Sequence, residues 1–225
     1  MILYKCMTSE RVTDTPPALR VILERRSIKT GFRDIEIDPA VIDSIIECGL
    51  SAPSSKNAQP WRMHVVTNKL TLHGIAEHID SVAEQEKREF RPVDPSSGNR
   101  RSYVSTVSES AQVLREVPLG IFIENQGKFS NGRQSVSASP DSVRVGALIG
   151  VGLEYIGLGA SIENMWLAAQ AHDISGVFMG DVLIAEDTIK SQLGMVGDLV
   201  GVLALGYSDR EPGPKVVENN VVRHI

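Results

Sequence analysis

The stretch from Val143 to His172 constrains the fold of this chain most, because it is apolar on nearly every side. About thirty helical residues span roughly 45 Å, which is long enough to cross a whole domain. The charged residues Arg144, Glu154 and Glu163 interrupt the run. A membrane span is a poor explanation, since it needs about twenty uninterrupted apolar residues. The run therefore predicts a buried helix, or a broken pair of helices, in a globular protein.

Glycines recur along this run, where each costs about 1 kcal/mol relative to alanine in a helix interior. Close approach of another helix would offset that cost. We therefore expect tight packing against a second helix at some of these positions, which are Gly146, Gly150, Gly152, Gly157 and Gly159.

Composition places the chain among soluble globular proteins and excludes several functions. With 225 residues, 42% hydrophobic and 23% charged, it fits a single domain. A net charge of -5 gives no general attraction to nucleic acid. The two cysteines, Cys6 and Cys48, make no disulfide framework or redox pair, so we expect a cytoplasmic location. The five histidines lack zinc-type spacing, and we expect no metal site.

Helix and strand signals alternate along the chain. Thr15 followed by Pro16 and Asp38 followed by Pro39 are typical helix starts. PLGIFIE at 118–124 has the apolar density of a central strand. Mobile lid or insert segments are expected at 81–102 and 125–142, and an extended arm at 208–225. Further helices are expected at 16–26, 41–50, 70–79, 104–116 and 184–193, and further strands at 62–67 and 199–207.

Two polar motifs carry the chemistry. RRSIK at 25–29 ends the first helix with three cations and a hydroxyl, groups suited to holding a phosphate. The same cations also fit a solvated helix end favoured by the helix dipole. APSSKNAQPW at 52–61 cannot continue a helix, because Pro53 and Pro60 lack backbone donors. It predicts a shaped polar loop, either for a ligand or held by local side-chain to backbone bonds.

Together with GASIENMWLAAQAHDISGVFMG at 159–180, these motifs resemble the FMN-dependent nitroreductase family. The resemblance spans most of the chain. It implies an α+β fold in which helices flank a central, mostly antiparallel sheet. It also implies an intertwined homodimer with a long central interface helix, built from one FMN-binding domain over residues 1–225.

The resemblance also implies roles for individual residues. Arg25, Arg26 and Ser27 would bind the phosphate, and Lys29 would reach the N1 and O2 edge of the flavin. The backbone of Met179 and Gly180 would pass the N5 edge. A late cation, Lys215 or its rival Arg223, would complete the phosphate site, and Gln112 lies nearest a ring contact that we could not place. The loop would reach the flavin of the other subunit through Pro53, Ser54, Ser55, Asn57 and Gln59.

The implied activity is FMN-dependent reduction of nitroaromatic, quinone or related small-molecule acceptors by NADPH or NADH. Hydride would pass through FMN N5 in a ping-pong scheme, with no catalytic side chain. One alternative is a specialised enzyme of the same fold, such as a reductive dehalogenase, in which Arg101 and Tyr103 grip the substrate. Another is a noncatalytic protein that binds or stores flavin. The dehalogenase-like alternative would depend on the charged stretch from Glu86 to Tyr103. The composition of that stretch is also typical of a solvated charge run.

Overall fold

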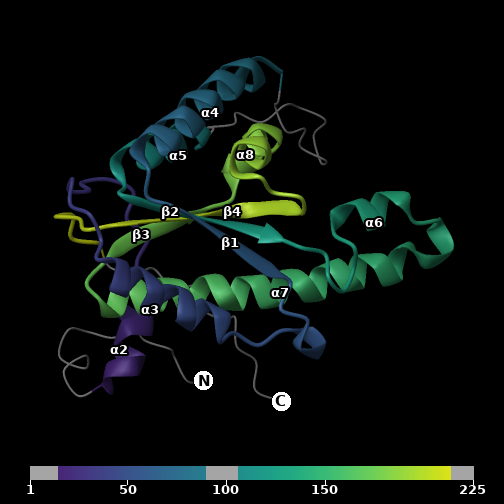
Figure 1. The fold of residues 1–225 in the computed structure, drawn as a ribbon, viewed down its shortest axis with the longest axis horizontal. Helices are drawn as coiled ribbons and strands as arrows, with labels where there is room; N and C mark the ends of the chain where they lie inside the picture. The colour runs from purple at the N-terminus through teal and green to yellow at the C-terminus, as the bar shows by residue number, and fades with distance from the viewer. Residues whose placement is uncertain (1–14, 90–105, 214–225) are drawn as a thin grey trace, which may run out of the picture.

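A four-stranded antiparallel sheet in the order β1-β2-β4-β3 forms the centre of the molecule (Figure 1). The computed structural model describes residues 15–89 and 106–213. Every residue of β2 is buried, which confirms that PLGIFIE lies in a central strand. The strands are β1 (Trp61–Val66), β2 (Leu119–Asn125), β3 (Ser175–Met179) and β4 (Asp198–Gly206).

Helices cover both faces of this sheet (Figure 1). One layer contains α4 (Lys69–Glu89), α5 (Val107–Glu116) and α8 (Glu186–Leu193), and the other contains α3 (Pro39–Leu50) and α7 (Asp141–Ala171). Successive strand side chains point to opposite faces, so β2 serves two cores. Ile121 and Ile123 join the core under α3 and α7, while Phe122 joins the core under α4 and α5.

Helix α7 is one unbroken helix and is only partly covered within a single chain. By length and composition it is the one described helix that could cross a membrane. Its covered side nevertheless packs against α3 and the sheet, as expected of a core helix. Gly150 and Gly157 contact loops of the same chain, whereas Gly146, Gly152 and Gly159 face open space. The expectation of a buried helix therefore holds for one side of α7, and the alternative of a broken pair is wrong.

The segment 81–102 is partly misread from sequence. Helix α4 continues to Glu89, and residues 90–102 lie outside the described residues. The apolar side of the helix continues past Ile79 to the buried Ala83, and glutamate, lysine and arginine are good helix formers. The prediction of a mobile segment is therefore wrong for residues 81–89, which continue the helix.

Other differences are local. Helix α2 spans Pro17–Glu24 with Pro16, not Thr15, at its N-cap. Strand β3 was not predicted as a strand. The segment 125–142 contains α6 (Arg133–Ala138), which Figure 1 shows beside the N-terminal end of α7. The prediction of an exposed loop is thus wrong for part of that segment.

A buried carboxylate anchors the chain between β2 and α6. Glu154 of α7 accepts hydrogen bonds from the backbone N–H groups of Phe129 and Ser130, at 2.7 and 3.0 Å. The Ser130 hydroxyl and the Asn125 amide complete the set, at 2.5 and 3.0 Å. Burial alone raises the pKa of Glu154, but these hydrogen bonds together leave it below its ordinary value.

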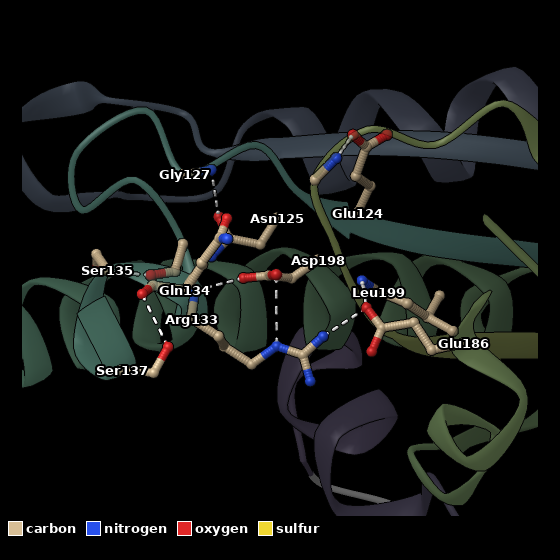
Figure 2. Close-up of polar contacts among 12 residues, drawn as sticks. Glu124, Asn125, Gly127, Arg133, Gln134, Ser135, Ser137, Glu186, Asp198 and Leu199 are labelled. Atoms are coloured by element: carbon tan, nitrogen blue, oxygen red, sulfur yellow. Dashed lines mark hydrogen bonds and ion pairs between the residues drawn. The ribbon is translucent and has the colours of Figure 1, made fainter.

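Arg133, the first residue of α6, attaches this helix to β4 and α8, as Figure 2 shows. The backbone N–H of Arg133 donates to Asp198 at 2.6 Å, and its guanidinium donates to Glu186 at 2.5 Å. Glu186 also accepts from the backbone N–H of Leu199 at 2.9 Å. The start of α6 is therefore tied to both β4 and α8.

We predict that Glu154→Gln lowers the free energy of unfolding by about 3 kcal/mol at neutral pH. The amide offers N–H groups to a site that already contains four donors. Because the folded pKa is lowered, the carboxylate contributes fully above its ordinary pKa of 4.5, and this contribution is lost as the pH falls further. Urea unfolding of the wild type and of Glu154→Gln should show that the difference in their free energies of unfolding narrows below pH 4.5.

The control is Glu47→Gln, which removes an exposed carboxylate from α3. It should change stability little at either pH. A Glu154→Gln variant as stable as this control would contradict the anchoring role.

Candidate functional site

The RRSIK segment extends the sheet along the free edge of β3. Ser27 pairs in parallel with Gly176, and the backbone N–H of Ile28 donates to the Gly176 carbonyl at 2.9 Å. Further along, the Arg33 N–H donates to the Tyr207 carbonyl at 2.8 Å. Backbone pairing at Ser27 and Ile28, and a backbone hydrogen bond four residues beyond the segment, therefore fix its position.

Arg25 is held against α7. Its Nε donates to Glu163 at 3.1 Å, and its guanidinium lies 4.0 Å from the ring centroid of Trp166. Nη1 is buried and has no hydrogen-bond partner among the described residues. A buried unpaired N–H is costly, so this donor suits an anionic ligand.

The side chain of Arg26 points toward the end of α2. Its Nη1 donates to the carbonyls of Leu23 and Arg25, at 2.7 and 2.9 Å, at the end of α2. Its buried Nε lacks a partner within the described part of the chain. Arg26 lines a hollow of about 390 Å³ together with Gln170, Ser175 and others. The two arginines therefore differ in surroundings, although the sequence gives them the same predicted role.

Lys29 meets a residue that sequence reasoning missed. Its ammonium lies 2.5 Å from the carboxylate of Glu109, in the first turn of α5. Gln112, the residue considered from sequence, instead donates to Glu116 one turn further along α5. The two residues lie 80 positions apart in the chain, so no local pattern pointed to Glu109.

The turn after β3 is pinned by the same end of α5. Asp181 accepts hydrogen bonds from the hydroxyls of Thr106 and Ser110, at 2.7 and 2.8 Å. The side chain of Met179 is buried in the core, so only its backbone can face a ligand here. A Cβ added to Gly180 would meet only one atom of Phe178, at 3.9 Å. Gly180 is also partly exposed, so a ligand can approach its backbone.

The PSSKNAQPW loop, residues 53–61, is strained. Lys56, Asn57 and Gln59 have φ values of 51°, 53° and 46°, in the left-handed region that few side chains adopt. Local bonds hold this shape: the Ser54 hydroxyl accepts from the Gln59 N–H at 3.0 Å, and the Gln59 amide donates to Asn57 at 3.1 Å. Lys56 lies 5.0 Å above the ring of Phe129. Strain of this kind gathers at ligand sites, which makes the loop a functional candidate.

The loop and the RRSIK segment sit at different places along α7. The loop packs on α7 at Gly157, where a Cβ would come within 3.2 Å of Ser54. Arg25 packs at Glu163 and Trp166, about 9 to 14 Å further along the helix at 1.5 Å per residue. One chain thus presents the two motifs separately. Arg101, Tyr103, Lys215 and Arg223 lie outside the described residues.

The residues present suit FMN part by part. Arg25 and Arg26 each have a buried unpaired donor that suits an anion such as a phosphate, and the charge of Lys29 suits the electron-rich edge of a reduced ring. The amides of Asn57 and Gln59 and the hydroxyl of Ser55 offer neutral hydrogen bonds. These groups fulfil different needs of one ligand: the cations suit its charged parts, and the amides and the hydroxyl suit its neutral polar parts.

We predict that Lys56→Gly is more stable than Lys56→Ala by about 1 kcal/mol, because alanine is strained at positive φ and both variants lose the Phe129 contact. Thermal or urea unfolding of the two variants measures this difference directly. Glu47, exposed in α3, supplies the control pair, and there alanine should be the more stable by about 1 kcal/mol. An alanine variant at position 56 as stable as the glycine variant would show that the loop is unstrained.

Comparisons with known proteins agree with the motifs. The chain matches the Nitroreductase family over residues 22–207. It is 22% identical over 207 residues to a chloronitrobenzene nitroreductase of Comamonas testosteroni, which covers 87% of this chain and 88% of that protein. This relative spans nearly the whole of both proteins, so the likeness is not confined to the motifs.

Solved structures share the fold. A nitroreductase with bound FMN from Desulfitobacterium hafniense has a TM-score of 0.68 at 20% identity, covering 94% of this chain and 99% of that one. An NADPH:FMN oxidoreductase from Vibrio harveyi complexed with NAD+ has a TM-score of 0.60 at 18% identity, covering 92% and 79%. The family match over most of the chain confirms the expectation from its motifs: this protein belongs to the nitroreductase family.

Proposed function

We propose that the protein is an FMN-dependent oxidoreductase that uses NADPH or NADH to reduce nitroaromatic, quinone or related acceptors. FMN, when bound, supplies the hydride chemistry at N5, and donor and acceptor would use one site in turn in a ping-pong scheme. The observation that carries this proposal is the meeting of Lys29, the open face of Gly180 and the first turn of α5 at the edge of β3.

The residues of the chain would bind the flavin and orient it. Arg25, stacked on Trp166 and paired with Glu163, is already fixed in position for the phosphate. Lys29 would place positive charge at the ring edge that becomes electron-rich on reduction. Asp181 would keep the turn at Gly180 in place through Thr106 and Ser110. This preorganisation is the contribution that a protein makes to cofactor chemistry.

Relatives support the choice of substrates. The Comamonas protein is named for chloronitrobenzene, and a Nocardioides relative is a 4-nitrobenzoate reductase that is 21% identical over 204 residues. The Vibrio structure contains NAD+. These ligands are known for those proteins, and we extend the classes, not the individual compounds, to this chain. We further propose a cytoplasmic location, which suits the free thiol of Cys48.

We also propose a homodimer formed along α7. Its uncovered side carries Val145, Ile149 and Ile156, which are 68%, 58% and 70% exposed. With the open glycines 152 and 159 they recur at alternating spacings of four and three residues, the pattern of a helix packing against another helix. A second copy would also bring the PSSKNAQPW loop toward the RRSIK segment of its partner, as the family resemblance implies.

Anaerobic addition of NADPH tests the proposed activity. Protein reconstituted with FMN should lose its visible flavin absorbance and regain it when a quinone or nitroaromatic compound is added. Flavin that stays oxidised with both NADPH and NADH would leave a noncatalytic binding protein as the better explanation. Turnover of halogenated substrates alone, abolished by changing Arg101 or Tyr103, would favour the dehalogenase-like alternative.

Arg25→Ala should weaken FMN binding about 10- to 100-fold, since a charge-assisted hydrogen bond contributes about 1.5–3 kcal/mol. Arg62→Ala is the matched control. It removes a half-exposed arginine from β1, at the opposite edge of the sheet. Equal flavin affinity in the two variants would place the phosphate elsewhere.

Ile149→Asp is predicted to convert the dimer to a monomer, because it puts a charge in the middle of the apolar stripe of α7. Sedimentation velocity should show the change in mass, and flavin retention should fall with it. Leu70→Asp is the control, since Leu70 is 83% exposed on α4, in the layer on the other face of the sheet. A variant that is still dimeric would locate the interface away from this stripe.

A further inference from the structure

Glu109 is a charged group at the candidate site that the proposed function does not use. Its Oε2 lies 2.5 Å from the ammonium of Lys29, although 80 positions separate the two residues in the chain. An acidic residue in the first turn of a helix is favoured by the helix dipole, and this alone would explain Glu109 in α5. The dipole does not explain why the carboxylate meets this particular lysine.

The surroundings of Glu109 hold it in place. Thr106 and Ser110, on either side of Glu109, both donate to Asp181. Ser110 is buried, and Asp181 directly follows Gly180. The first turn of α5 is therefore fastened to the turn at Gly180. Glu109 approaches Lys29 from a fixed position, not from a free helix end.

The pair changes the electrostatics of the site. An ammonium alone favours a neighbouring group that gains negative charge, whereas an ammonium beside a carboxylate is nearly neutral at a distance. The side chains of Lys29 and Glu109 are 39% and 46% exposed, so solvent screens but does not remove the effect. The charge that Lys29 offers a ligand is thus set by Glu109.

We propose that Glu109 is a positioning residue that holds Lys29 and offsets its charge, and thereby lowers the reduction potential of the bound flavin. This inference rests on the proposed function, since it needs FMN beside Lys29. Two-electron reduction adds negative charge to the flavin, so a less positive environment makes the reduced form less stable. The chain would in this way keep a cation in place for binding while limiting how strongly that cation stabilises the reduced cofactor.

The test is the midpoint potential of bound FMN in three variants, measured against a reference dye at low ionic strength. Glu109→Gln keeps the shape and removes the charge. It should favour the reduced flavin about fivefold, which raises the two-electron potential by about 20 mV. Glu109→Asp retains a carboxylate and should stay near the wild-type value. Glu116→Gln is the matched control, because it removes the charge of another glutamate of α5, two turns beyond Glu109. It should leave the potential unchanged.

Salt gives a second measurement that a purely structural role would not affect. The difference between wild type and Glu109→Gln should shrink at high ionic strength, because screening weakens both charges. A difference that persists unchanged in high salt would overturn the electrostatic inference.

Other outcomes separate this inference from the proposed function. If FMN binds and NADPH reduces it, but Glu109→Gln does not raise the potential, the inference fails and the proposed function stands. An equal rise in Glu116→Gln also overturns it, because any lost carboxylate would then suffice. If the wild type takes up no FMN, both fail together.

Discussion

Helix α7 has a wide apolar surface that the described part of the chain covers on one side only, and much of the structure follows from how that surface is divided. One side forms the floor of the core beneath β2 and β4. The same helix supports the strained loop at Gly157, the loop after β2 at Glu154, and the first arginine of RRSIK at Trp166. The remaining stripe is the surface on which we propose that a second copy of the helix packs. Fold, candidate site and proposed assembly thus depend on one helix.

At the edge of β3, charges are paired instead of simply accumulated. Arg25 has Glu163 and Lys29 has Glu109, so two of the cations assigned to the cofactor already have an acidic neighbour. Exposed pairs of this kind add little to stability. They fix the direction of long side chains before a ligand arrives, which reduces the entropy lost on binding. The site therefore differs from a plain basic patch, which would attract any anion.

Features set by nearby residues could be predicted from the sequence, and those set by distant ones could not. The start of α3 is local: Asp38 accepts from the Ala40 N–H at 2.8 Å and Pro39 opens the helix. PLGIFIE is apolar enough to show that β2 is covered on both faces. Strand β3 is short and contains Gly176, and it becomes a strand through pairing with β4, which is distant in the sequence. The Lys29–Glu109 pair depends on how the chain folds back, so neither motif revealed it.

Glu154 holds the loop after β2 in a way that allows some substitutions in that loop and not others. Two of its four hydrogen bonds come from main-chain N–H groups, at Phe129 and Ser130, and every residue except proline carries such a group. These two bonds do not depend on side-chain identity, so an exposed side chain such as that of Lys128 can vary without loosening the attachment, whereas Gly127, Ser130 and Gly132 cannot. New surface chemistry can arise there while the scaffold that carries it stays the same.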